Sequence, residues 1–254
     1  MDNKILFIVE GKNDEVRYIE RLFKVSYPLQ NYEIVPYKTN LHNLTKQVIT
    51  DGKIDDSLDI RLVLKENEKD PEIKAKLSQN FSDIIMVFDF EPQQDIPRFE
   101  DIRKMLEYFN SSTESGKLYI NYPMMQSYRH FAKLPDKSFN QLMVSKQDSK
   151  KYKEIVNGES KFKNIDHHSY QLFVSIAFHH LVKLNYVANG IEYLPDIQYI
   201  RTWKQENLFD IQLQLLNTSE EIYVINTFAL YLVEYNPENF YNQIKKHSSR
   251  FSIY

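Results

Sequence analysis

A short apolar run near the start of the chain, Ile5–Val9, constrains the fold more than any other feature. Four of its five residues are β-branched or aromatic, a composition typical of a strand buried on both faces of a parallel sheet. The run stops at Glu10-Gly11, and an amphipathic helical pattern begins a few residues later. A carboxylate at the carboxyl end of a buried strand lies where open α/β sheets bind their ligands. The sequence therefore predicts an α/β fold with a site at the end of this strand.

A second buried-strand run, Ile84–Phe88, ends in an Asp-x-Glu pair formed by Asp89 and Glu91. Alternate side chains of a strand project to the same side, so these two carboxylates are expected to point together. Asp14 follows Glu10 by four positions, and both face one point if the turn leads directly into a helix. Carboxylate oxygens are the hard ligands that Mg²⁺ prefers. The four acids therefore predict a magnesium site.

These residues resemble a Toprim domain, the catalytic module of bacterial primases, type II topoisomerases, OLD-family nucleases and small ribosomal-RNA maturation nucleases. The family pattern is a strand ending in Glu-Gly with an acid shortly after it, followed by a strand ending in Asp-x-Asp. This chain supplies Glu10-Gly11 with Asp14, and Asp89 with Glu91 in place of the last aspartate. That replacement adds one methylene and keeps the ligand type. The resemblance covers about the first half of the chain.

The length and amino-acid composition limit the number of domains and exclude several kinds of site. With 254 residues, the chain has room for one large domain or two small ones. The absence of cysteine excludes disulfides and thiolate metal sites. A net charge of −3 gives no global case for nucleic acid binding, so a basic surface must be local. No apolar run approaches the roughly 20 residues of a membrane span, and the first strand leaves no room for a signal peptide. We expect a cytoplasmic protein with no membrane partner.

The order of patterns along the first half is strand, helix, strand, helix, which is typical of a parallel sheet with helical crossovers. We expect a Toprim-like α/β domain over residues 1–135, with a parallel sheet flanked by helices. A charged segment at about 51–80 interrupts the rhythm and reads as a helical insertion broken before Pro71, either a solvated excursion or a recognition arm. Residues 136–254 are expected to form a mostly α-helical domain.

A third strand run, Lys117–Asn121, leads into Pro123, which favours the first position of a helix. This arrangement predicts that Gln126 and Arg129 lie near the carboxyl edge that carries the acids. In the sequences that this stretch resembles, we expect glutamate at the position of Gln126. Glutamine removes one negative charge, which weakens attraction for Mg²⁺ and eases repulsion among the carboxylates. The change indicates natural tuning toward low activity or an engineered inactive form, unless Gln126 is an ordinary helix-surface residue.

Other polar residues permit two interpretations each. Lys12 either neutralises a phosphate or is simply solvated. The lysines of Lys146–Lys153 form a solvated face or touch a phosphate backbone. The histidine pairs at 167–168 and 179–180 lack the spacing of a His-Glu-x-x-His zinc motif. They are expected to be core or solvated residues, with a general-base role as the alternative.

Among Toprim-like proteins, the chain looks most like the RloB-like and OLD-like group of bacterial anti-phage abortive-infection systems. Its size, the Glu-Gly-Lys-x-Asp opening, the Asn121-Tyr122-Pro123 segment and the helical tail carry this resemblance. It implies a metal-dependent endonuclease that cleaves RNA or DNA beside an ABC-type or AAA-type ATPase. Whether the chain forms a homo-oligomer is left open. The alternatives are a ribosomal or transfer RNA maturation nuclease and a non-catalytic module that docks a partner ATPase. The expected catalytic set is Glu10, Lys12, Asp14, Asp89, Glu91 and Gln126, of which the four acids hold one or two Mg²⁺ or Mn²⁺.

Overall fold

The computed structural model describes residues 3–93 and 98–250. The chain divides into two compact units, Met1–Asp89 with Gln94–Tyr119, and Phe90–Gln93 with Ile120–Tyr254. The first unit contains β1 (Lys4–Val9), α1 (Asp14–Ser26), β2 (Asn31–Pro36), α2 (Leu41–Val48), α3 (Ile60–Asn67), α4 (Pro71–Leu77), β3 (Asp83–Asp89), α5 (Phe99–Tyr108) and β4 (Asn110–Ser111). Strand β5 (Gly116–Asn121) runs from the first unit into the second.

The second unit is mostly helical, with one pair of short strands among the residues that the structure describes. Its elements are η1 (Met125–Arg129), η2 (Lys137–Gln141), β6 (Met143–Ser145), η3 (Asp148–Lys151), α6 (Tyr152–Glu159), η4 (Ile165–His167), α7 (Tyr170–Asn189), α8 (Ile197–Arg201), α9 (Gln205–Ser219), β7 (Glu221–Tyr223), α10 (Phe228–Tyr235), the π-helical turn η5 (Pro237–Tyr241) and α11 (Asn242–Arg250). The sequence-based boundary at residue 135 and the division of the structure differ in where they assign residues 90–93 and 120–135.

The sheet is mostly parallel and, within the described residues, has five strands in the order β2-β1-β3-β5-β4. Strand β1 pairs in parallel with both β2 and β3, and Val9 lies opposite Val87. All but the first residue of β1 and of β3 is buried, as expected for central parallel strands. The predicted α/β class, with a parallel sheet flanked by helices, is confirmed.

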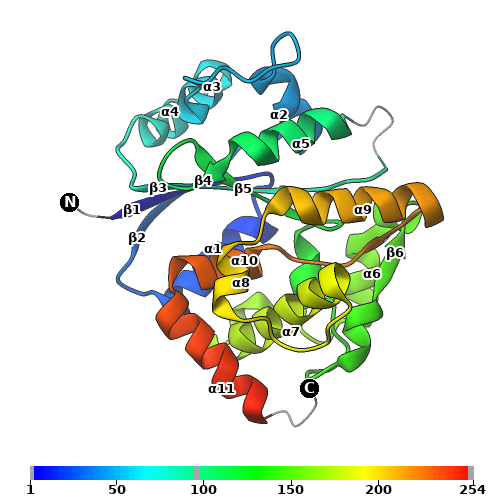
Figure 1. The fold of residues 1–254 in the computed structure, drawn as a ribbon. Coiled ribbons are helices and arrows are strands. Elements are labelled where there is room, and N and C mark those ends of the chain that lie inside the picture. The colour runs from blue at the N-terminus through cyan, green and yellow to red at the C-terminus, as the bar shows by residue number, and fades with distance from the viewer. Residues whose placement is uncertain (1–2, 94–97, 251–254) are drawn as a thin grey trace. The chain divides into compact units, whose positions relative to one another are not determined.

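Helices cover both faces of this sheet (Figure 1). Helix α1 lies on one face, where Phe23 packs edge-on against Phe7 of β1 with ring centroids 5.3 Å apart. Helices α2 to α5 lie on the other face. The segment predicted as an insertion contains α3 and α4, and α4 begins at Pro71 with the Asp70 side chain accepting from the Glu72 N–H. Proline fits this first position because its missing N–H has no helical partner to lose.

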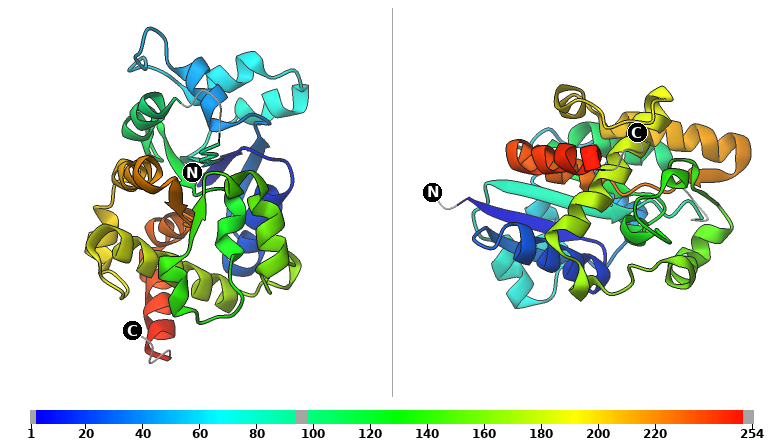
Figure 2. Two further views of the ribbon diagram at one scale, coloured as in Figure 1. Left: turned by 90° about the vertical axis from the view of Figure 1, so that its right-hand side faces the viewer. Right: turned by 90° about the horizontal axis from the view of Figure 1, so that it is seen from below.

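Helix α7 is the centre of the second unit. It contacts η1, η2, α9, α10 and α11, and the views of Figure 2 show it in yellow-green beside α11 in red. The Ser169 side chain caps its start by accepting from the Leu172 N–H, and Gly190 ends it at φ 71°. Glycine adopts this left-handed conformation without the steric cost of a Cβ. No helix in the described ranges has both the length and the apolar character to cross a membrane.

Two histidines that the sequence assigned to core or solvent, His179 and His180, are both buried in α7. The Nδ1 of His179 bonds the Ser175 carbonyl at 2.8 Å, and its Nε2 accepts the Asp136 N–H at 3.0 Å. These contacts require the neutral ring, with its proton on Nδ1. Burial lowers the pKa of His179 to about 4, while Ser175 and Asp136 oppose that shift and His247 adds to it.

Because the buried ring of His179 is neutral, we expect the folded protein to lose stability as the pH falls. Between about pH 6.5 and about pH 4 the unfolded chain binds a proton at His179 that the folded chain does not. We expect the free energy of unfolding to fall by about 3 kcal/mol across that window on account of this group. Urea unfolding at a series of pH values measures it, and His179→Gln should flatten the profile relative to His167→Gln, an exposed histidine. Parallel profiles for the two variants would contradict the assignment.

Candidate active site

The carboxyl ends of β1 and β3 bring two of the predicted acids together. The Glu10 N–H donates to the Val87 carbonyl at 3.3 Å, which continues the β1–β3 pairing past Val9. The Glu10 side chain then crosses to the neighbouring strand, where its Oε2 accepts the Asp89 N–H at 3.1 Å. Asp89 is the last residue of β3 and is 9% exposed, whereas Glu10 is half-buried. This side-chain-to-backbone bond places both acids at the same edge of the sheet, as the Glu10–Asp89 pair.

The turn after β1 carries the next candidates. Asp14 is half-buried at the first position of α1, where an acid also complements the helix dipole. Lys12 is exposed. A Cβ added to Gly11 would lie 2.5 Å from Glu15 Oε2, so glycine at this position allows the Glu15 carboxylate to approach closely. Glu15 is 7% exposed and was not among the predicted site residues. Its place as an acid in the first turn of the helix was the available sequence signal.

The described residues contain no group of three or more histidines or acids placed to hold a metal ion. The structure therefore brings together Glu10 and Asp89 but does not gather all four predicted ligands into one metal-ready cluster. Glu91 and Gln126 belong to the second unit and are described with it.

The expectation that Asp89 and Glu91 share one side of a strand was wrong. Strand β3 ends at Asp89, and Glu91 has a left-handed φ of 46°. That conformation costs a non-glycine residue about 1–2 kcal/mol. The N–H groups of Phe90 and Glu91 both donate to the Pro123 carbonyl, at 3.1 and 3.3 Å. These two bonds turn the backbone out of the extended conformation, so strand alternation does not apply to Glu91.

The helix expected to begin at Pro123 was also wrong in type and start. Met124 is extended, and a 3₁₀-helix, η1, begins at Met125. Because the Pro123 carbonyl accepts from the 90–91 segment, it is not engaged in a helical bond. Gln126 lies inside η1 and is 4% exposed, so it is not an ordinary surface residue.

Two side chains of the 129–130 segment fix η1 to α6. Arg129 Nη2 donates to Asn157 Oδ1 at 2.8 Å. His130 bonds the buried Tyr152 hydroxyl through Nδ1 and Glu159 Oε2 through Nε2, both at 2.9 Å. Burial lowers the pKa of His130, although Glu159 acts in the opposite direction. These bonds hold the element that carries Gln126.

Comparison with protein-family models, curated proteins and solved structures finds no match to this chain. The Toprim resemblance therefore rests on the two acidic motifs and their order. To these the structure adds one geometric fact, which is that Glu10 and Asp89 meet at the carboxyl ends of adjacent parallel strands.

Because Gln126 is buried, the hypothesis that it removes a negative charge from the site can be tested by restoring that charge. By the Toprim resemblance, which expects glutamate at this position, Gln126→Glu should raise Mg²⁺ affinity and cleavage rate. Calorimetric titration of Mg²⁺ and a cleavage assay on the same preparation measure both effects, with Gln141→Glu, at an exposed position, as the control. If Gln126→Glu only lowers stability, as an unpaired buried carboxylate does, the residue has no role toward the metal.

Proposed function

We propose that this chain is a Mg²⁺-dependent nuclease that cleaves phosphodiester bonds in RNA or DNA. The observation that carries the proposal is the Glu10–Asp89 pair, in which a side chain from the end of β1 reaches the end of β3. The carboxyl edge of a parallel sheet is the ligand-binding edge of open α/β folds. The order of the acidic motifs supports the same activity through the Toprim resemblance.

The chemistry of this pair fits magnesium. Mg²⁺ in proteins is held by one or two carboxylates and keeps several water molecules, so two acids suffice as protein ligands. The bond from the Asp89 N–H occupies one acceptor position of Glu10. Hydrogen bonds of this kind orient carboxylate ligands. Glu10 and Asp89 would hold the ion, and Asp14 and Glu91 complete the set in the family pattern.

When bound, a divalent ion of this kind activates water and stabilises negative charge that develops on phosphate. The residues of the chain position and balance that charge. Burial of Asp89 fixes its side chain at the sheet edge. The Lys38 N–H donates to the Glu10 carbonyl at 3.0 Å and holds the turn that carries the acid. Exposed Lys12, two positions after Glu10, supplies a cation for substrate phosphate.

The experiment that tests the proposal is a cleavage assay on labelled single- and double-stranded RNA and DNA. Cleavage is expected with Mg²⁺ or Mn²⁺ and should stop on addition of EDTA. Preference for structured ribosomal or transfer RNA precursors would favour a maturation nuclease over an anti-phage effector acting beside an ATPase. Activity that is unchanged by EDTA would overturn the metal-dependent mechanism.

A second candidate, a non-catalytic module that docks a partner ATPase, is favoured by one observation. The described residues lack a three-acid metal group. This candidate predicts that Glu10→Gln leaves biological protection intact in a host that carries the partner. The nuclease predicts that the same variant retains partner binding and loses protection.

A further inference from the structure

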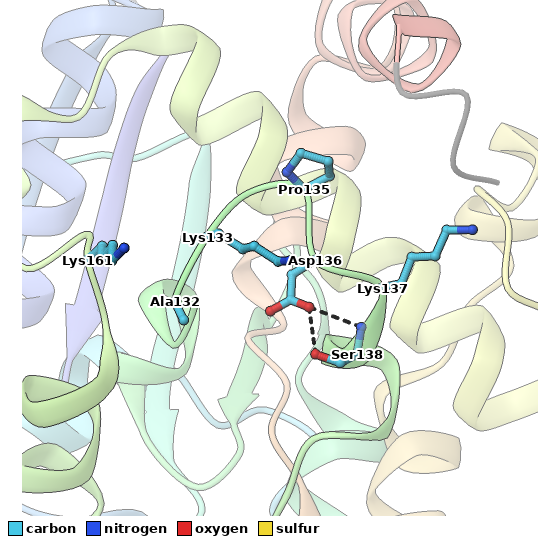
Figure 3. Close-up of a pocket in the computed structure, with 7 residues that line it drawn as sticks. All are labelled: Ala132, Lys133, Pro135, Asp136, Lys137, Ser138 and Lys161. Carbon is cyan, nitrogen blue, oxygen red and sulfur yellow. Dashed lines mark hydrogen bonds between the residues drawn. The ribbon is translucent and has the colours of Figure 1, made fainter.

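We propose that a lysine-lined cavity in the second unit binds the phosphate backbone of the nucleic acid. This inference rests on the proposed function, and it adds a contact surface that no acidic motif indicates. The cavity has a volume of about 670 Å³ and is lined by Ala132, Lys133, Pro135, Asp136, Lys137, Ser138 and Lys161 (Figure 3). Its volume falls within the range of small-molecule sites, roughly 300–1,000 Å³.

The charges around this cavity do not balance. Three lysines and a single acid, Asp136, line it. The Asp136 carboxylate already accepts from the Ser138 N–H at 3.0 Å and from the Ser138 hydroxyl at 2.6 Å. The side chains of Lys133 and Lys161 are exposed and form no ion pair or hydrogen bond within the described residues. Figure 3 shows Lys137 extending away from Asp136. Lys133 and Lys161 therefore present ammonium groups whose charge no described side chain balances.

The backbone that carries these lysines is anchored. On one side, the Asp136 N–H donates to the buried Nε2 of His179 at 3.0 Å. On the other, the Lys161 N–H donates to the Phe131 carbonyl at 3.1 Å. The buried Ser160 hydroxyl donates to the Arg129 carbonyl and accepts the Phe162 N–H at 2.9 Å. The two walls are thus linked directly through residues 131 and 161, so the lysines are presented from a defined scaffold.

A strand of phosphates is the ligand that this arrangement favours. Lysine acts as a point charge toward phosphate, and counterion release makes each such contact favourable. The surrounding sequence is basic although the chain carries a net charge of −3. Acids at 136, 148, 154 and 159 are outnumbered there by Lys133, Lys137, Lys146, Lys150, Lys151, Lys153, Lys161 and Lys163. The cavity lysines thus belong to the same basic stretch of sequence as the predicted phosphate contact at Lys146–Lys153.

Binding of a single-stranded oligonucleotide, measured by fluorescence anisotropy in EDTA over a series of salt concentrations, tests this inference. Each of Lys133→Gln and Lys161→Gln should lower the slope of log affinity against log salt by about 0.7, the contribution of one phosphate contact on a single strand. Lys204→Gln is the matched control, because it removes the same charge from an exposed lysine of the same unit that pairs with Glu206. Circular dichroism verifies that all variants are folded.

Slopes for Lys133→Gln and Lys161→Gln that equal those of the wild type and of Lys204→Gln would overturn the inference. Equal displacement of the oligonucleotide by poly-glutamate would also overturn it, since the surface would then recognise acidic chains rather than phosphates. Because EDTA prevents metal-dependent cleavage, the result is separate from the proposed activity. Altered slopes in a chain that cleaves nothing would support the binding surface and reject the nuclease.

Discussion

Asp89→Asn is expected to lower Mg²⁺-dependent cleavage by roughly 10²–10³-fold, the range seen when one electrostatic stabiliser of a transition state is removed. Asparagine keeps the shape of the side chain, and the bond from the residue 89 N–H to Glu10 Oε2 is a backbone contact that survives the change. The fold should therefore remain intact while a hard anionic ligand is lost. Initial rates at saturating Mg²⁺ and a thermal melt of each protein provide the measurement.

The matched control lies at the other end of the same strand. Asp83 is the first residue of β3, and its carboxylate accepts from the hydroxyls of Ser112 at 2.7 Å and Ser82 at 2.9 Å. Asp83→Asn makes the same chemical change at the amino edge of the sheet and should leave the cleavage rate within a factor of about two of the wild type. Equal loss of activity in both variants would show that Asp89 acts through the stability of β3.

Lys183→Ala is expected to destabilise the second unit by about 3–4 kcal/mol. Lys183 is fully buried in α7, and its Nζ donates to the carbonyls of Phe139 and Leu142 and lies 4.5 Å from the Phe139 ring centroid. Burial lowers the pKa of this amine well below its ordinary value. Truncation to alanine leaves a cavity, and comparable truncations of buried long side chains cost about 2–5 kcal/mol. Urea unfolding followed by circular dichroism measures the loss.

Lys183→Met separates packing from charge. Both carbonyls keep another donor, because the Leu142 N–H bonds Phe139 at 3.1 Å and the Val224 N–H bonds Leu142 at 3.1 Å. Methionine fills a similar volume and avoids burying an ammonium group, and such replacements are often neutral or stabilising. We expect a change of about 1 kcal/mol or less. A loss in Lys183→Met as large as that in Lys183→Ala would mean that the ammonium group itself holds η2 in place.

The central strands were predictable because the amino-acid composition of each run indicates that it is buried. An uninterrupted apolar run such as Ile5–Val9 is stable only between two covered faces. The edge position of β2 was also predictable, because Pro36 at its end cannot donate to a further strand. The acid after each central strand follows from the same patterns, so the Glu10–Asp89 pair was accessible from sequence.

The wrong predictions concern residues whose backbone conformation depends on hydrogen bonds to segments distant in the sequence. The conformation of Glu91 and the late start of η1 both depend on the Pro123 carbonyl, which accepts N–H groups more than thirty residues away in the chain. The preceding residue, Tyr122, exchanges backbone bonds with Ile225, at 2.8 and 2.9 Å. No local pattern encodes such pairings. Burial of Lys183 was hidden for the same reason, because its carbonyl partners lie about forty residues before it.

Calorimetric titration of Mg²⁺ into the metal-free chain tests the central claim most directly. We expect binding to the wild type and to Asp83→Asn, and loss of that binding in both Glu10→Gln and Asp89→Asn. Mn²⁺ titrations followed by electron paramagnetic resonance should give the same pattern. Metal binding that persists unchanged in both Glu10→Gln and Asp89→Asn would contradict the assignment of this acidic pair as the metal site.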